Sequence, residues 1–314
     1  MMEIKSFEDV ADFCTYIQST RRPAILKNFP VGSCLERWKD PCYLQEKLED
    51  KVAKIHKVEK ELADQMDFRT KNFQYQSLPM ADLIQHVFHP RDEHQFAYYL
   101  RWVGEDPRGQ SKANFHLDFP SLAQDFQLPP ELFFPDQRFF SSVLRISSEQ
   151  IRVWTHYDVM DNMYVQIVGT KEVIMWAPHE ALNMYLESDK SKVVHLNDPD
   201  LALKFPKFSK AIQHKGTLDP GDILFIPALW FHNMKATSAG VAINVFWKNL
   251  DPDLYDKKDP YGNKDLLPAA KASRMLDNVW HQLDSLPDEY RDFYGRQLIA
   301  RLENKCLTKK DVNE

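Results

Sequence analysis

Metal ligation is the chemistry that the residue types of this 314-residue chain favour most clearly. Eleven histidines supply imidazoles, whereas the four cysteines lie far apart without a Cys-x-x-Cys pair, which indicates reduced thiols and no structural zinc site. Two histidines have a carboxylate two positions later, in His116-Leu-Asp118 and His156-Tyr-Asp158, and chance alone predicts about one or two such pairs. His116 lies in a loop-like segment, but His156 ends an alternating segment that is typical of a strand. Residues two apart on a strand share a face, so His156 and Asp158 could hold one ion.

A third ligand must come from elsewhere in the chain, and His232 is the candidate. It follows the segment Asp219-Pro-Gly-Asp-Ile-Leu-Phe-Ile-Pro227, in which a turn precedes a short apolar strand. Two histidines and one carboxylate form the facial triad of non-haem iron(II) oxygenases, which leaves coordination positions for a co-substrate and dioxygen. Each histidine, taken alone, could instead be a hydrogen-bonded core residue.

The co-substrate that commonly chelates such a metal, 2-oxoglutarate, has a second carboxylate that needs a cation and polar donors in the protein interior. Lys171, which opens a strand-like segment, is the candidate cation, with Asn162 as an amide and Tyr99 as a phenol. Lys171 could instead be a solvated turn lysine. Asn244 lies in an apolar segment and is a further candidate for the same pocket, but the strand period leaves its direction open.

The elements that must position these residues are mainly strands. Short segments rich in Val, Ile, Phe and Trp occupy residues 139–146, 151–156, 162–168, 172–176, 193–196, 222–226 and 241–247. Many short strands without long helices between them predict a sandwich or barrel and not a parallel sheet. Before this region, helical periodicity predicts helices at residues 7–18 and 79–87. Strand-like composition predicts strands at residues 21–29 and 95–102. Residues 42–71 are charged and mixed and predict no clear element.

The end of the chain returns to helical periodicity. Apolar residues recur at helical spacing over 272–283 and, after Pro287, over 290–302. Two amphipathic helices joined at a proline predict a helical hairpin, which must bury its apolar faces on the barrel or against a second subunit. The expected organisation is therefore N-terminal elements over 1–94, a catalytic core over 95–250 and C-terminal helices over 251–314.

Charge and composition exclude several classes of protein. The net charge of −6 gives no general attraction to nucleic acid, so such a partner would need a local basic patch, with acidic residues kept away from it. Only nine glycines and no Gly-x-Gly-x-x-Gly motif argue against dinucleotide binding. The chain begins without a signal-peptide pattern, and no segment reaches the roughly 18 apolar residues of a membrane span. We expect an intracellular protein, cytoplasmic or nuclear, with no membrane or DNA partner.

These residues together carry a resemblance to a known family. His156-Tyr-Asp158, Asn162, Lys171, the segment Gly221-Asp-Ile-Leu-Phe-Ile-Pro227 and His232 resemble the JmjC domain of 2-oxoglutarate oxygenases, a cupin-like group that includes the hypoxia-factor asparaginyl hydroxylase. Longer runs resemble the tRNA-hydroxylating branch of this family, at 65–68, 71–73, 98–101, 140–148, 154–162, 221–233, 246–248 and 287–294. The similarity therefore covers most of the chain.

The resemblance implies a fold, a reaction and a set of ligands. The fold would be mainly β with flanking helices: a double-stranded β-helix, or jelly roll, with N-terminal α/β elements and a C-terminal helical hairpin that builds a homodimer. The catalytic iron(II) ligands would be His156, Asp158 and His232. The residues that bind 2-oxoglutarate would be Tyr99, Asn162 and Lys171. The substrate would be the side chain of the wybutosine precursor at the guanosine 3′ of the anticodon in tRNA-Phe. Val153 stands where the asparaginyl hydroxylase has threonine, so Thr155 is not assigned to the co-substrate.

A tRNA substrate would require cations and aromatic walls near the site. Arg145 and Arg101 are the substrate-binding candidates, and further residues near the site in sequence are Arg108, Arg138 and Arg152, with Trp102, Tyr157 and Trp230 as walls. Each arginine could instead be a solvated surface residue. Two other functions stay open: a JmjC hydroxylase of protein side chains, and a non-catalytic cupin-like scaffold that binds partners through its helical hairpin.

Overall fold

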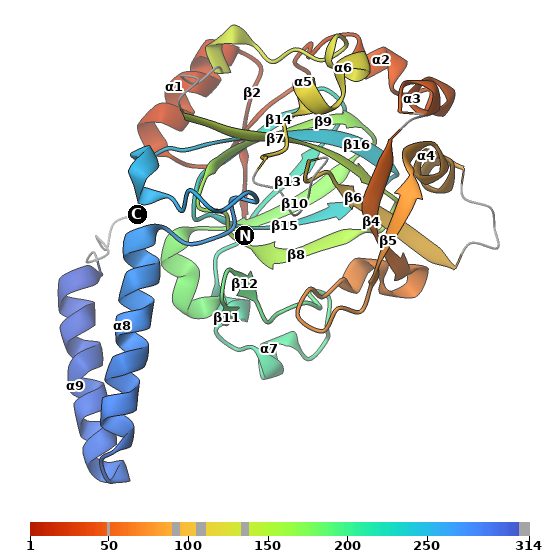
Figure 1. Ribbon diagram of the computed structural model, residues 1–314. Coiled ribbons are helices and arrows are strands. Elements are labelled where there is room, and N and C mark those ends of the chain that lie inside the picture. Colours follow the sequence, from red (N-terminus) through yellow and green to blue (C-terminus); the bar gives the residue numbers. More distant parts are fainter. Residues whose placement is uncertain (49–50, 90–94, 105–110, 133–137, 308–314) are drawn as a thin grey trace. The chain divides into compact units, whose positions relative to one another are not determined.

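The computed structural model describes residues 1–48, 51–89, 95–104, 111–132 and 138–307, and two β-sheets dominate it (Figure 1). The first sheet has the spatial order β1 (Met2–Glu3), β13 (His214–Leu218), β10 (Lys171–Trp176), β15 (Phe231–Ala236), β8 (Arg152–His156), β12 (Lys190–Ser191) and β11 (Leu186–Glu187). The second has the order β2 (Lys5–Phe7), β3 (Ala24–Leu26), β14 (Ile223–Ile226), β9 (Asp161–Val168), β16 (Gly240–Trp247), β7 (Phe139–Ser147), β6 (Phe96–Arg101), β4 (Val52–Glu59) and β5 (Gln74–Pro79).

The chain crosses repeatedly between the two sheets from β7 onward. Strands β8, β10, β13 and β15 lie in the first sheet, whereas β7, β9, β14 and β16 lie in the second. Within each set of four, neighbouring strands pair antiparallel. This arrangement is a double-stranded β-helix, or jelly roll, flanked by helices, so the predicted fold class is confirmed.

Apolar residues fill most of the space between the sheets. Strand β9 is buried along its whole length, because one face lies inside the barrel and the other is covered by packed elements. The interior cluster includes Ile4, Tyr164, Val173, Met175, Leu224, Ile226, Trp230, Met234 and Ala242. Burying each large apolar side chain contributes about 1.5–3 kcal/mol. Polar side chains at inward positions of this barrel are therefore exceptions that need a functional or structural reason.

The N-terminal helices pack around the barrel and fix one of its strands. They are α1 (Val10–Thr20), α2 (Cys34–Arg37), α3 (Pro41–Lys47), α4 (Met80–Phe88), α5 (Phe115–Asp118) and α6 (Pro120–Ala123). A further short helix, α7 (Leu201–Lys204), comes later, between β12 and β13. The Asp9 side chain caps α1, accepting hydrogen bonds from two backbone N–H groups at 2.8 and 2.9 Å. Arg21 ends the helix in the left-handed region, at φ 53°, and donates two hydrogen bonds of 2.6 Å to Asp161 at the start of β9.

Four sequence expectations need correction. Residues 193–196 form no strand; Val193 and Leu196 are apolar because they pack in a cluster with Trp176 and Phe208. His116-Leu-Asp118 lies in the short helix α5 and not in a loop. Strands β13 and β15 were missed because both are short and contain polar residues, and residues 42–71 hold β4 and the 3-10 helix η1 (Lys60–Gln65).

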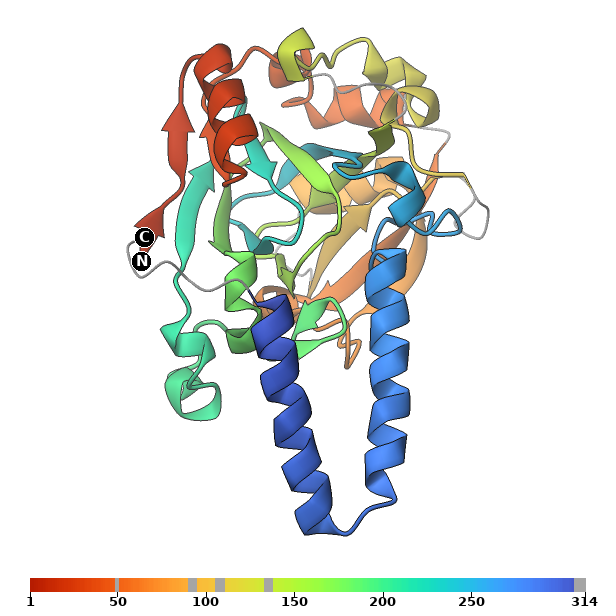
Figure 2. The ribbon, with the colours of Figure 1, turned by 90° about the vertical axis from the view of Figure 1, so that its left-hand side faces the viewer.

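The C-terminal helices form a second compact unit, made of residues 254–256 and of those from 265 onward. Helices α8 (Leu267–Asp284) and α9 (Asp288–Cys306) run antiparallel as a hairpin, as their periodicity predicts (Figure 2). Large apolar side chains on them are exposed, among them Met275, Leu276, Trp280, Tyr290, Phe293 and Ile299. Over the part of the chain that the structure describes, none of the helices combines the length and the apolar character needed to cross a membrane.

Candidate metal centre and its two pockets

The jelly roll brings His156, Asp158 and His232 together, as the sequence predicts. His156 on β8 and His232 on β15 are register partners on neighbouring antiparallel strands, with ring centroids 4.3 Å apart. Asp158 follows β8, and its Oδ2 lies 3.7 Å from His232 Nε2. One ligand atom from each of the three residues lies within 4.8 Å of the others, so the three side chains can hold a metal ion.

Backbone contacts leave both imidazoles ready to bind a metal. Nδ1 of His156 lies 2.8 Å from the carbonyl oxygen of Trp154, and Nδ1 of His232 lies 3.1 Å from that of Trp230. A carbonyl oxygen only accepts, so Nδ1 carries the proton and Nε2 keeps a free lone pair. Burial, assisted by the neighbouring His232, lowers the pKa of His156 to about 3, and burial also lowers the pKa of His232. Both rings are therefore neutral at pH 7.

Asp158 is held in the turn that follows β8. Its backbone carbonyl accepts a hydrogen bond of 2.8 Å from the N–H of Leu229, which adopts a left-handed conformation at φ 68° just before β15. Burial alone would raise the pKa of Asp158, but the two imidazoles and the guanidinium groups of Arg101 and Arg145 outweigh it and lower this pKa. The carboxylate is thus ionised at neutral pH.

A pocket inside the barrel, here called the inner pocket, adjoins the two histidines. Its lining residues are Tyr99, Arg145, Val153, His156, Asn162, Tyr164, Lys171, Ile226, His232, Met234 and Asn244. Lys171 is 3% exposed, and its ammonium lies 5.6 Å from the ring centroid of Tyr164. Burial, followed by the nearby Arg145, lowers the pKa of Lys171 to about 7. Among the described residues that line this pocket there are two cations and no carboxylate.

A chain of hydrogen bonds crosses the inner pocket and resolves the direction of Asn244. Its Nδ2 donates to Asn162 Oδ1 at 2.9 Å, and its Oδ1 accepts from Arg145 Nε. Arg145 Nη1 donates to the hydroxyl of Tyr99. The structure therefore brings all three residues predicted for 2-oxoglutarate, Tyr99, Asn162 and Lys171, into this one pocket, and places Asn244 beside them.

A larger cavity of about 370 Å³, here called the outer pocket, opens next to the metal centre. Its lining residues are Lys54, His56, Phe68, Tyr75, Tyr99, Arg101, Val103, Arg145, Val153, Trp154, His156, Asp158, Asp189, Lys190, Tyr261 and Asn263. Two metal-ligand candidates thus lie in its wall, together with several aromatic rings. Four cations line it against two carboxylates, of which Asp189 is bound by Lys190.

Both arginines predicted to contact the substrate lie in the outer pocket, on neighbouring strands. Arg101 of β6 and Arg145 of β7 are register partners, and Arg101 Nη2 donates to the carbonyl of Tyr261 at 3.1 Å. Arg101 Nε is buried and has no hydrogen-bond partner. Burial, followed by repulsion from Arg145, lowers the pKa of Arg101. Two neighbouring cations, one of which has a spare donor, make this wall a suitable contact for an anionic group.

The other predicted substrate contacts are not in this pocket. Trp102 donates to Asp118 at 2.9 Å, Trp230 packs in the barrel interior, and Tyr157 packs against Phe231. Arg152 is buried against Asp64 and Asn233, and Arg138 binds the carbonyl of Asn249, so both have structural partners. Arg108 lies outside the described residues. Proximity in sequence to a predicted ligand therefore did not place these side chains in the outer pocket.

Sequence reasoning missed the residues that form the aromatic part of the outer pocket: His56, Phe68, Tyr75 and Trp154. Three of them lie between residues 52 and 79, where β4 and β5 were not predicted. The alternation of apolar and polar residues over Ala53-Lys-Ile-His56 was the available signal. Trp154 was visible as the residue two positions before His156, on the same face of its strand.

The chain belongs to the family of proteins with a cupin-like domain, whose model matches residues 10–253. Its sequence is similar to tRNA wybutosine-synthesizing protein 5 of Danio rerio, at 44% identity over 99% of this chain and 95% of that protein. It is also 42% identical to the protein of the same name from Homo sapiens, over 95% and 93% of the two chains.

A longer protein shares the same region. The chain is 36% identical to tRNA wybutosine-synthesizing protein 4 of Gibberella zeae, over 93% of this chain but only 28% of that protein. The sequence of this chain thus matches only part of that larger polypeptide.

Proposed function

We propose that this protein is an iron(II)- and 2-oxoglutarate-dependent hydroxylase of tRNA. It hydroxylates the side chain of the wybutosine precursor at the guanosine 3′ of the anticodon in tRNA-Phe. The observation that carries the proposal is the inner pocket, where the buried Lys171 and the half-buried Arg145 lie against a His, Asp, His cluster, with no carboxylate among the described lining residues. The similarity to wybutosine-synthesizing proteins supports the choice of tRNA as the substrate.

The donor set of the inner pocket fits 2-oxoglutarate, a dianion. Lys171 is buried with no carboxylate within ion-pair distance among the described residues, and an uncompensated buried ammonium is costly. A carboxylate beside Lys171, with the amide of Asn162 and the hydroxyl of Tyr99 as further donors, removes that cost. Neutral imidazole nitrogens and one carboxylate suit iron(II). When bound, iron(II) and 2-oxoglutarate supply the oxidising power that inserts one atom of dioxygen into a C–H bond.

The residues of this chain bind and orient the reactants. His156, Asp158 and His232 hold the metal, and the carbonyls behind the two imidazoles fix their direction. Lys171 fixes the far end of the co-substrate. Val153, Ile226 and Met234 line the rest of the inner pocket and exclude water.

The outer pocket fits a flat, substituted base. Base–aromatic stacking contributes about 1–3 kcal/mol per base, and the pocket offers Phe68, Tyr75 and Trp154 for it. The cations Lys54 and Arg101 are available for phosphate or for an anionic group on the base, whereas Lys190 already pairs with Asp189. This local excess of positive charge explains how a chain with a net charge of −6 can hold a tRNA. A tRNA substrate also requires an intracellular location.

We further propose that the C-terminal helices build a homodimer. The exposed apolar side chains of α8 and α9 have no reason to face water, and a second copy of the same hairpin would cover them. Trp280→Glu and Phe293→Glu should yield a monomer by light scattering. A wild-type monomer at micromolar concentration would contradict the proposed dimer.

The test of the proposed reaction is mass spectrometry of tRNA-Phe nucleosides after incubation with the protein, iron(II), ascorbate and 2-oxoglutarate. The wybutosine precursor should gain the mass of one oxygen atom, and Asp158→Ala should abolish the gain. An unchanged spectrum together with peptide-dependent succinate release would favour a protein side-chain hydroxylase. No succinate release with either substrate would favour a non-catalytic scaffold.

A further inference from the structure

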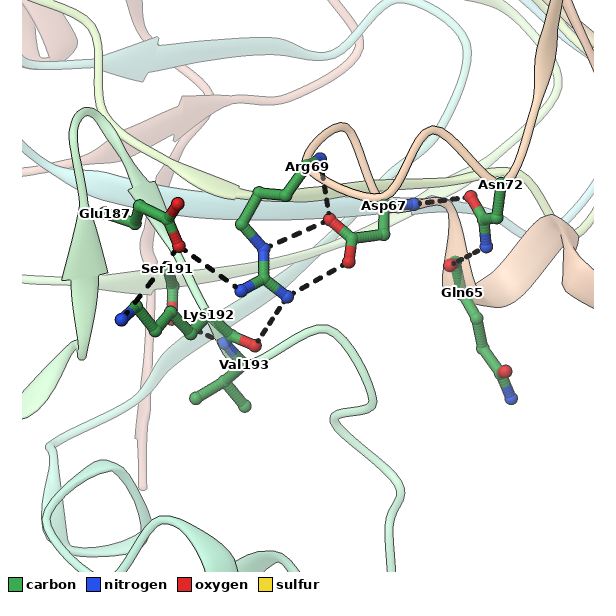
Figure 3. Close-up of polar contacts among 8 residues, drawn as sticks. All are labelled: Gln65, Asp67, Arg69, Asn72, Glu187, Ser191, Lys192 and Val193. Atoms are coloured by element: carbon green, nitrogen blue, oxygen red, sulfur yellow. Dashed lines mark hydrogen bonds and ion pairs between the residues drawn. The ribbon is translucent and has the colours of Figure 1, made fainter.

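Two segments that lie far apart in the sequence meet through the polar contacts drawn in Figure 3. The first, here called the loop, runs from Gln65, the last residue of η1, to Asn72, two residues before β5. The second is the hairpin β11–β12 with Lys192. Phe68 of the loop and Lys190 of the hairpin both line the outer pocket. The Lys190 ammonium lies 4.9 Å from the ring centroid of Phe68. The loop and the hairpin therefore build this part of the wall together.

The loop is held in one conformation by its own side chains. Asn72 Oδ1 accepts from the N–H of Asp67 at 2.8 Å, and Asn72 Nδ2 donates to the carbonyl of Gln65 at 2.8 Å. Asp67 Oδ1 accepts from the N–H of Arg69 at 2.9 Å, and Asp67 Oδ2 accepts from Arg69 Nη2 at 3.0 Å. Phe68 lies between Asp67 and Arg69 in sequence, so these contacts hold the backbone on either side of it.

Arg69 extends these contacts to the hairpin. Its Nη2 donates to the carbonyl of Lys192 at 3.3 Å, and its Nη1 lies 3.6 Å from Glu187 Oε2. We call Arg69 with Asp67, Glu187 and Lys192 the Arg69 clasp; Figure 3 shows its guanidinium between the two segments. The planar fork of arginine can serve a carboxylate on one side and acceptors of the hairpin on the other, which a lysine ammonium cannot.

The hairpin is in turn attached to the strand that carries a metal ligand. Lys190 is the register partner of His156, and the carbonyl of Asp189 accepts from the N–H of Tyr157 at 3.2 Å. The loop reaches the same strand through its aromatic ring, because the centroid of Phe68 lies 5.1 Å from that of Trp154. The clasp thus closes a ring of contacts around the aromatic wall beside the metal centre.

We propose that Arg69 is a positioning residue of the outer pocket. It ties the loop to the hairpin and so holds Phe68 against Trp154, as the aromatic wall on which the substrate base stacks. This inference rests on the proposed function, because it requires that the outer pocket receives a base. Arg69 itself contacts neither the metal ligands nor the lining of the inner pocket among the described residues.

The test compares Arg69→Ala, Arg69→Lys and Glu187→Gln with the wild type in the full-length enzyme. The readouts are the KM for tRNA-Phe that carries the wybutosine precursor, the KM for 2-oxoglutarate, and thermal unfolding. Both Arg69 variants should raise the tRNA KM about tenfold, the value of one weakened stacking contact. Glu187→Gln should raise it about two- to threefold, as expected for a half-exposed ion pair. The KM for 2-oxoglutarate should stay unchanged.

Two further arms separate the clasp from simpler explanations. If Arg69 instead contacts a phosphate, the Arg69→Lys variant should keep the wild-type KM for tRNA. The Glu187→Gln variant should then lower this KM, because the change removes a negative charge near the phosphate. Either result would overturn the proposal. An equal rise in both Michaelis constants would show a general loss of structure and would also overturn it. Lys39→Ala is the matched control, because Lys39 pairs with Glu36 on the surface and lines neither pocket.

The design also separates the clasp from the proposed function. A wild-type enzyme that releases no succinate with this tRNA would overturn both. An active wild type whose Arg69 variants keep the wild-type tRNA KM would overturn only the clasp.

Discussion

The inner and outer pockets share the metal centre but are built on different principles. Side chains at inward positions of strands line the inner pocket, and their directions follow from pairing registers inside the barrel. The outer pocket, of about 370 Å³, depends in part on a loop that precedes the barrel in sequence and on the hairpin β11–β12, which lies between β10 and β13 along the chain. Strand positions fix a small, rigid ligand precisely, whereas loops can adapt to a larger one. This difference supports a division in which the inner pocket holds the co-substrate and the outer pocket selects the substrate.

The two pockets also differ in how their charges are balanced. Lys171 and Arg145 face the inner pocket without a carboxylate, so the ligand-free protein tolerates uncompensated charge there. In the outer pocket, Lys190 is bound by Asp189. The inner pocket therefore lowers the stability of the protein in exchange for affinity for an anion. In the outer pocket the charge is balanced only in part, because Lys190 has a carboxylate partner whereas Arg101 Nε is buried without a hydrogen-bond partner.

The largest effect is expected from Lys171→Met. Loss of the buried cation leaves the co-substrate carboxylate unpaired, so the KM for 2-oxoglutarate should rise on the order of 100-fold. The matched change in the outer pocket, Lys190→Met, should leave this KM within about twofold and raise the KM for tRNA instead. Succinate release at varied concentrations of each substrate measures both. If Lys171→Met and Lys190→Met changed the KM for 2-oxoglutarate and the KM for tRNA equally, the proposed division between the two pockets would be contradicted.

A second effect of Lys171→Met concerns stability without ligands. Replacing a buried unpaired cation by an apolar side chain of similar size should raise the free energy of unfolding of chelator-treated protein by about 1–4 kcal/mol at pH 7. Because the folded pKa of Lys171 is lowered to about 7, the unfolded chain binds the additional proton above that pH. Wild-type stability therefore rises relative to the variant as the pH increases from 7 to about 10. Urea unfolding at several pH values measures the difference, and a difference that grows with pH would contradict it.

The third effect sharpens the role of the outer pocket. Tyr75 is 45% exposed at this pocket, and Tyr75→Ala should raise the tRNA KM about tenfold by removing a stacking surface. Tyr75→Phe is the control, because it keeps the ring and should remain within about twofold of the wild type. The KM for 2-oxoglutarate should not change in either variant. A loss that Phe does not rescue would assign the effect to the hydroxyl and not to stacking.

The sequence predicted the inner pocket far better than the outer one, for a physical reason. Metal ligation and burial of an anion need particular residue types, so His156, Asp158, His232 and Lys171 were recognisable from type and spacing. Their geometry follows from the jelly roll, which the short apolar segments indicated. Asn244 was recognised as a residue type but not oriented, since its direction depends on the pairing of β16 with β9.

The outer pocket depends on features that have no strong local pattern. Phe68 is one aromatic residue in a charged segment, and only tertiary contacts through Arg69 and Trp154 give it a role. Proximity in sequence suggested Trp102 and Trp230, which pack elsewhere. The aliphatic segment 193–196 likewise predicted a strand, although its residues are apolar because they fill a satellite cluster.

The most direct test of the central claim is to measure succinate and the hydroxylated nucleoside in the same reaction, with iron(II), 2-oxoglutarate and tRNA-Phe carrying the wybutosine precursor. The account predicts equal amounts of the two products in the wild type and neither product in the His232→Ala variant. Succinate release that is independent of the tRNA, with no change in the nucleoside, would contradict it.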